Sequence, residues 1–187
     1  MKKNTTQETE LFRPLAVDKI PAGGVEEDII ANKTERAALA ARFGLLDLPV
    51  LEAHLDIDHT EGRMIKVTGS FRAEVVQQCV VTLEPVAASI EETIDVIYAP
   101  EAVLDVGANP PHGDVFEDEI PEPIINGIID LGELVAQHLA VAINPYPRKP
   151  GAEMPVFASQ AMTSNPGADN PFVKLAEMKE KTPEKDR

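Results

Sequence analysis

Two stretches in the first half of the chain alternate between apolar and polar residues at nearly every position. They are "LPVLEAHLDIDHT" (48–60) and "MIKVTGSFRAEVVQQC" (64–79). Alternation with a period of two places the apolar side chains of a strand on one face and the polar side chains on the other. A turn at Glu84–Pro85 then precedes a third strand over about 87–98. Three long consecutive strands predict an antiparallel meander sheet over about 48–98, with one packed and one solvated face.

The segment "KTERAALAARFGL" (33–45) has the pattern of a short helix. Thr34 is of a type that caps helix N-termini, and Gly44 stands where a glycine commonly ends a helix. Leu39 and Phe43 are four residues apart and share one helical face, which we expect to meet the core. The sequence therefore predicts a helix over about 34–43.

A second helix is predicted over about 131–142, within "IIDLGELVAQHLAVAINPYPRKPGA". Asp130 serves as its N-cap, and Glu133 stands where it completes a capping box. One apolar stripe runs along the helix, and Asn144–Pro145 ends it. Together with the meander, the two main helices define an α+β fold.

The N-terminal region before the first helix holds weaker strand patterns. "LFRPLAVDKIP" (11–21) is typical of a short strand, and Pro14 within it predicts an edge position because proline cannot donate to a ladder. "AGGVEEDIIAN" (22–32) is interpreted as a glycine-led loop with room for a short strand or turn.

The domain organisation follows from where these patterns stop. We expect a disordered tail over 1–10 and a single α+β domain over 11–152. Inside that domain, residues 99–126 are rich in proline, glycine and acids and predict a long acidic loop. Residues 153–187 form a flexible C-terminal tail that contains a short amphipathic helix over 171–181.

The charge distribution narrows the classes of partner. The 187 residues carry a formal net charge of −15, and no Lys or Arg stands between Arg72 and Arg148, whereas 14 Asp and Glu residues do. Such a surface repels phosphates, because nucleic-acid affinity depends on Lys and Arg that neutralise the backbone. It attracts basic proteins and speeds their encounter. The same acidity is also what plain solubility requires, so the sequence leaves both interpretations open.

Two groups of residues are candidates for partner binding. One lies in the acidic loop and consists of Glu117, Asp118, Glu119 and Glu122. The other is a compact basic patch in a proline-rich frame, formed by Tyr146, Arg148 and Lys149. This patch could hold a phosphate or an acidic partner, or it could pair internally with the acidic loop; we favour internal pairing slightly.

Cys79 is the single cysteine, so the chain cannot form an internal disulfide. Its sequence neighbours are acidic, which predicts a raised thiol pKa and a weak nucleophile. It has no companion at metal-ligand spacing, since the residue three positions on is Thr82. We therefore expect a small, half-buried apolar side chain.

An enzymatic alternative is built on His54, Asp56 and Asp58, which share one strand face. Neighbours on such a face are about 6.5–7 Å apart, so a metal-dependent hydrolase or nuclease needs a further ligand such as His112 or His138. The solvated face of a strand is the favoured interpretation. The sequence shows no catalytic motif, so we predict no enzyme activity, no metal and no cofactor.

The chain has no apolar run long enough to span a membrane, and its start lacks the apolar core of a signal peptide. We therefore expect a cytoplasmic protein without membrane association.

Two motifs carry a resemblance to a known family. They are "CVVTLEPV" and "IDLGELVAQHLAVAINPYPRKPGA", in a chain order of strand, helix, meander, acidic loop and helix. Over about residues 11–180 the chain resembles the YceD-like family, the large ribosomal RNA subunit accumulation proteins, in their alphaproteobacterial form. The signature positions are Cys79, Leu83, Glu84, Pro85, Asp130, Leu131, Pro145 and Pro147.

The resemblance implies a non-enzymatic role in ribosome biogenesis that supports 23S ribosomal RNA accumulation or large-subunit assembly. Together with the charge, it favours an acidic surface that binds a basic ribosomal protein or assembly factor, with ribosomal RNA contacted indirectly. This member departs from the family pattern C-x-R-C-L-x-P, since Val81 stands at the Arg position and Thr82 at the second Cys. It also lacks the cysteine-rich tail of many relatives, so metal binding of that kind is not expected here.

Overall fold

The computed structural model describes residues 9–100 and 121–153 of the chain. The chain divides into two compact units, Met1–Pro150 and Gly151–Arg187, and every described helix and strand belongs to the first. The predicted C-terminal helix at 171–181, most of the N-terminal tail and the middle of the predicted acidic loop lie outside the described residues.

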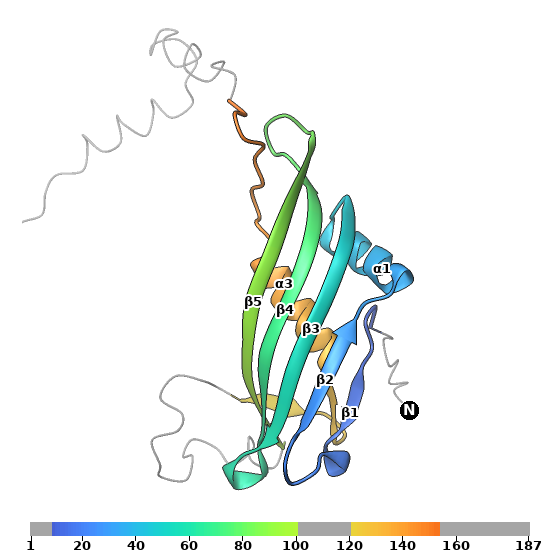
Figure 1. Ribbon diagram of the computed structural model, residues 1–187, viewed down its shortest axis with the longest axis vertical. Helices are drawn as coiled ribbons and strands as arrows, with labels where there is room; N and C mark the ends of the chain where they lie inside the picture. Colours follow the sequence, from blue (N-terminus) through green and yellow to red (C-terminus); the bar gives the residue numbers. More distant parts are fainter. Residues whose placement is uncertain (1–8, 101–120, 154–187) are drawn as a thin grey trace, which may run out of the picture. The chain divides into compact units, whose positions relative to one another are not determined.

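A five-stranded sheet forms the main layer, and Figure 1 shows its three long strands side by side. The strand order is β2-β3-β4-β5-β6; neighbours are antiparallel except for β5 and β6, which are parallel. The bounds are β2 Val25–Ile30, β3 Asp47–His59, β4 Ile65–Gln78, β5 Pro85–Pro100 and β6 Glu122–Ile124. The predicted meander and the α+β class are confirmed.

Two helices, α1 (Lys33–Phe43) and α3 (Leu131–Ala142), cover one face of this sheet, and the other face is open (Figure 1). A two-stranded sheet of β1 (Pro14–Ala16) and β7 (Ile128–Asp130) lies beside them, which gives Pro14 the predicted edge position. Short 3-10 helices occupy Val17–Lys19 and Glu61–Arg63.

The core lies between the sheet and the helices. Every second residue of β3 from Leu51 to Ile57 is buried there, as is nearly every second residue of β4 from Ile65 to Val75, which confirms the predicted alternation. Gly69 is the one core-face position of β4 without a side chain. A Cβ at this position would clash with the carbonyl oxygen of His54, and its φ of +153° is one that other residues rarely adopt. The two strands can therefore approach closely at this point.

The N-terminus of α1 differs from the prediction. Asn32, not Thr34, is the N-cap: its side chain accepts from the N–H groups of Thr34 and Glu35 at 2.9 and 3.1 Å. Glu35 in turn accepts the Asn32 N–H at 2.8 Å, which completes a capping box. The helix therefore starts at Lys33, two residues earlier than it would with Thr34 as the N-cap. Gly44 ends it with a φ of +67°, as predicted.

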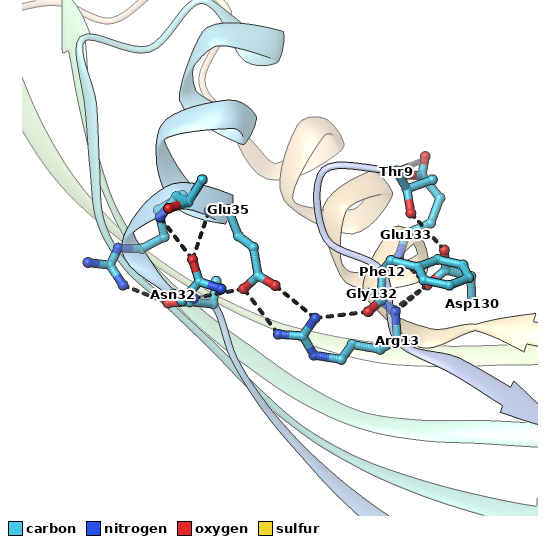
Figure 2. A network of polar contacts seen from close by, with 11 residues as sticks. Thr9, Phe12, Arg13, Asn32, Glu35, Asp130, Gly132 and Glu133 are labelled. Carbon is cyan, nitrogen blue, oxygen red and sulfur yellow. Dashed lines mark hydrogen bonds and ion pairs between the residues drawn. The ribbon is translucent and has the colours of Figure 1, made fainter. Parts of the chain in front are cut away.

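Asp130 caps α3 as predicted, but the expected capping box is wrong. Its carboxylate accepts the N–H groups of Gly132 and Glu133, and also the Thr9 hydroxyl and the Arg13 N–H, both at 2.9 Å (Figure 2). The Glu133 carboxylate turns away from the cap and forms two 2.8 Å contacts with Arg42 on α1. A tertiary ion pair therefore replaces the local hydrogen bond.

A second ion pair joins the chain before β1 to α1. The Arg13 guanidinium donates to both oxygens of Glu35 at 2.9 and 3.0 Å (Figure 2). This hydrogen bonding lowers the pKa of Glu35 and raises that of Arg13. The network fixes the position of α1 against the β1 segment through charge as well as apolar packing.

The predicted loop over 99–126 is strand at both of its ends, which contradicts that part of the prediction. The glycine-led stretch at 22–32, which had room for a short strand, holds β2. β5 continues to Pro100, and β6 returns beside it so that Tyr98, Ala99 and Pro100 pair with Glu122, Pro123 and Ile124. Because this pairing joins residues far apart in sequence, periodicity within either segment does not reveal it.

Candidate functional site

The open face of the sheet is an ordered acidic surface. Antiparallel register brings side chains of the same face into rows, such as Glu26–Asp56–Thr68–Asp95 across β2 to β5. We call the whole set the acidic face. Its carboxylates are Glu26, Asp28, Glu52, Asp56, Asp58, Glu74, Glu91 and Asp95, and its cations are Lys66 and Arg72. Acids therefore outnumber cations by six on one exposed surface.

Both cations of the acidic face are already engaged. Lys66 contacts Asp95 at 3.0 Å, and Arg72 contacts Glu74 at 2.9 Å and lies 3.9 Å from Glu91. These pairs are exposed and so contribute little to stability. Within the described residues, Glu26, Glu52, Asp56 and Asp58 have no ion-pair partner. They form the uncompensated part of the face.

His54 lies at the middle of the acidic face. Its Nδ1 is 2.7 Å from an Asp28 carboxylate oxygen, and this hydrogen bond raises the pKa of His54, with further contributions from the charges of Asp28, Asp56 and Glu26. The ring therefore takes up a proton more readily than a free histidine and partly offsets the negative charge as the pH falls.

The metal-dependent alternative finds no supporting geometry in the described ranges. No three His, Cys, Asp or Glu side chains gather there closely enough to hold a metal ion, and His54 pairs with Asp28 instead. The predicted further ligand His138 lies on α3, where its Nδ1 is 3.0 Å from the Leu134 carbonyl oxygen. The other predicted ligand, His112, lies outside the described residues.

Six of the eight predicted signature residues lie where two distant segments of the chain meet; the other two, Asp130 and Leu131, begin α3. The turn after β4 meets the chain that follows α3: Val80 donates to the Pro147 carbonyl at 2.9 Å, and Lys149 contacts Glu84 at 2.9 Å. Cys79 sits beneath this contact and is fully buried. We call residues 79–85 and 145–149 the hinge. The basic patch is thus placed at the hinge, with Lys149 paired to Glu84.

The prediction of a raised thiol pKa for Cys79 is wrong. Hydrogen bonding by the Thr82 side chain, followed by the N–H groups of Lys149, Thr82 and Val81, lowers the pKa of Cys79 to about 6. The N–H of Lys149 lies 3.3 Å from Sγ, and those of Val81 and Thr82 lie at 3.4 Å. The prediction failed because hydrogen bonds from the Thr82 side chain and from backbone N–H groups, one of them 70 positions away in sequence, lower the thiol pKa whatever the local acidity.

The remaining candidate residues are dispersed. Glu122 is exposed at the start of β6, while Glu117, Asp118 and Glu119 lie outside the described residues. Tyr146 is 72% exposed at the hinge, and Arg148 is exposed beside it.

The contribution of β2 to the acidic face is not evident from the sequence. The stretch 22–32 predicts a loop with room for a short strand or turn, and only the register sets Glu26 and Asp28 directly opposite Asp56 and His54. The charges were visible in the sequence; the pairing that gathers them was not.

Comparison with known proteins supports the resemblance. The family described as large ribosomal RNA subunit accumulation protein YceD matches residues 67–181, which is more than half of the chain. The chain belongs to this family, which implies a role in ribosome biogenesis and the accumulation of 23S ribosomal RNA. Neither curated proteins nor solved structures give a match. In the described ranges no helix is long and apolar enough to cross a membrane.

Proposed function

We propose that this protein is a non-enzymatic factor of large-subunit assembly that holds a basic protein on its acidic face. The partner is a basic ribosomal protein or assembly factor, and ribosomal RNA is contacted only through it. The observation that carries the proposal is the gathering of eight carboxylates on one sheet face, four of which form no ion pair with another described residue.

The arrangement of these charges supports binding over plain solubility. Glu26 and Asp56 are directly opposite each other on neighbouring strands, and like charges in that position destabilise a sheet. Solubility is served equally well by charges spread over the surface or placed opposite cations. A basic partner supplies positive charge and relieves the repulsion between these carboxylates. The repulsion that destabilises the free protein therefore favours formation of the complex.

The negative charge of the acidic face also favours a basic protein over RNA as the direct ligand. An RNA backbone would face an excess of carboxylates on this surface, and phosphate contacts require Lys and Arg. The exposed Arg148 and the Glu84-paired Lys149 at the hinge are too few to form a backbone-binding stripe. A cytoplasmic site of action follows from the proposed role in ribosome assembly.

Affinity purification from the native host, with and without RNase and followed by mass spectrometry, tests the proposal. We expect basic large-subunit proteins to be retained after RNase treatment and to be released as salt is raised. The double variant Glu26→Lys/Asp56→Lys should lose them. The matched variant Asp18→Lys/Glu61→Lys changes the same amount of charge at exposed sites outside the acidic face and should keep them. Retention of basic proteins that vanishes with RNase would contradict the proposal.

A further inference from the structure

The outer edge of β5 is a long strand edge without a partner in the described part of the chain. β5 pairs with β4 from Pro85 to Tyr98, but with β6 only from Tyr98 to Pro100. The twelve residues from Val86 to Ile97 therefore direct every second N–H and C=O group away from the sheet. The opposite edge strand, β2, has only six residues.

This edge lacks the bulges, prolines and lysines that usually block strand addition, and its charged residues are all acidic. The register with β4 is continuous from one end to the other, so no bulge twists the edge away. The stretch Val86–Ile97 contains neither proline nor lysine. Natural sheets normally protect exposed edges with such features. An open edge of this length is consistent with a surface that receives another strand.

A groove runs beside the edge, between β5 and α3. Its walls include Phe71 and Glu92 on the sheet side and His138, Val141 and Ala142 on the helix side. Val141 is 88% exposed although it lies on a helix whose opposite side is in the core. A strand added to β5 would place alternate side chains in this groove, where apolar ones would cover the exposed Val141.

The charge of the edge selects the occupant. Glu91 and Asp95 project on the acidic face and Glu92 on the groove side, and no Lys or Arg stands in β5. A second copy added antiparallel would set acidic strand against acidic strand, which is unfavourable. An extended segment with Lys or Arg at alternate positions would meet the carboxylates on the open face while its apolar residues enter the groove.

We propose that the outer edge of β5, from Val86 to Ile97, is a strand-addition site for an extended basic segment of the partner protein. This inference rests on the proposed function, because it names how the acidic face engages its basic partner. Backbone hydrogen bonds along the edge give affinity, and the alternation of cationic and apolar side chains gives selectivity.

Two synthetic peptides of the same composition test strand addition on the full chain. In one of about ten residues Lys and Val alternate, and in the other all Lys precede all Val. We expect the alternating peptide to bind about tenfold more tightly in fluorescence anisotropy, because only it matches both faces of an added strand. Amide hydrogen exchange should slow at every second residue from Val86 to Ile97 when it binds.

Proline variants locate the backbone contribution. Of the neighbours Glu91 and Glu92, one directs its N–H toward β4 and the other outward, so only one of Glu91→Pro and Glu92→Pro should keep the wild-type Tm. We expect that variant to bind the alternating peptide about tenfold more weakly, and the Gln variant of the same residue to bind nearly as well as wild type. The amide exchange pattern decides the question even where both proline variants unfold.

Three outcomes would overturn the inference. One is equal binding of the two peptides, and another is a slowing of exchange on binding that does not alternate along β5. The third is protection of the outward N–H groups already in the free chain, in addition to those bonded to β4, which would show that a segment of this chain or a second copy already occupies the edge. In each case the affinity purification with and without RNase still tests the proposed function independently. Failure of strand addition can therefore be distinguished from failure of the proposed function.

Discussion

Replacing Glu26 by Lys should make the protein more stable and a worse binder at the same time. Glu26 is exposed on β2 and lies directly opposite Asp56, with no cation of the described residues paired to either. The substitution converts a like-charge cross-strand pair into an opposite-charge pair. It also places a positive charge in the uncompensated part of the acidic face, where the proposed partner binds.

The magnitude follows from the cross-strand geometry. Like charges directly opposite destabilise and opposite charges stabilise, each by roughly 0.2–1 kcal/mol. The reversal should therefore raise the free energy of unfolding by about 0.5–1.5 kcal/mol at low ionic strength. Because both side chains face solvent, we expect the lower half of this range, and most of the gain should vanish at about 0.5 M salt.

Urea unfolding followed by circular dichroism, at low and high salt, measures the effect. Glu27→Lys is the matched control, because it changes the same charge at the next residue. Glu27 is exposed, pairs with Leu55 of β3 and projects on the face of β2 opposite to Glu26. Neither stability nor partner retention should change much in that control. Equal destabilisation by both variants, or a Glu26→Lys protein that is less stable than wild type, would refute the cross-strand repulsion.

The capping and hinge residues give further predictions. Asp130→Ala should lower the free energy of unfolding by about 2–3 kcal/mol, because the helix cap and the hydrogen bond from the Arg13 N–H are both lost. Asp130→Asn keeps an acceptor oxygen and should lower it by less than about 1 kcal/mol. Equal losses in the two variants would show that the charge of Asp130 matters more than its hydrogen bonds. Gly132→Ala should cost about 1–3 kcal/mol, because its Cβ would meet the Leu11 carbonyl, and a wild-type Tm would contradict that close approach. The pKa of Cys79 is lower in the folded protein than its ordinary value, so the thiolate stabilises the fold above that ordinary pKa and the contribution is lost as pH falls through about 6. Unfolding curves of wild type and Cys79→Ser should therefore differ most at alkaline pH, with partner retention unchanged; loss of binding in folded Cys79→Ser would show that the hinge thiol takes part in recognition.

The elements with a strong internal period were predictable from the sequence. β3 and β4 bury every second residue over a long run, so their core faces could be assigned before any pairing was known. Helix α3 could be located in the same way, since Asp130 and an apolar stripe mark it. These assignments depend on local properties, which a single sequence contains.

Features whose stability comes from distant partners were not predictable. β6 is a three-residue strand that contains Pro123 and exists only through its pairing with β5. Glu133 has the right spacing for a capping box, yet Arg42, 91 residues away in sequence, takes its carboxylate. In both cases a tertiary contact overrides the local preference.

The candidate site shows the same division. Its acidic character was evident from the charge pattern, but the gathering of charge on one sheet face depends on the register that sets Glu26 opposite Asp56. The lowered pKa of Cys79 likewise depends on Lys149, which only the fold brings to the hinge. The acidic composition predicts a basic partner. The register of the strands determines where the carboxylates that such a partner would contact lie on the described surface.

Direct competition between protein and RNA tests the central claim most directly. The full chain, immobilised, is offered protein-free 23S ribosomal RNA together with an extract of large-subunit proteins at low and moderate salt. We predict that basic proteins are retained, that the RNA is not, and that Glu26→Lys/Asp56→Lys releases the proteins while Asp18→Lys/Glu61→Lys does not. Retention of bare RNA without any basic protein would contradict the account.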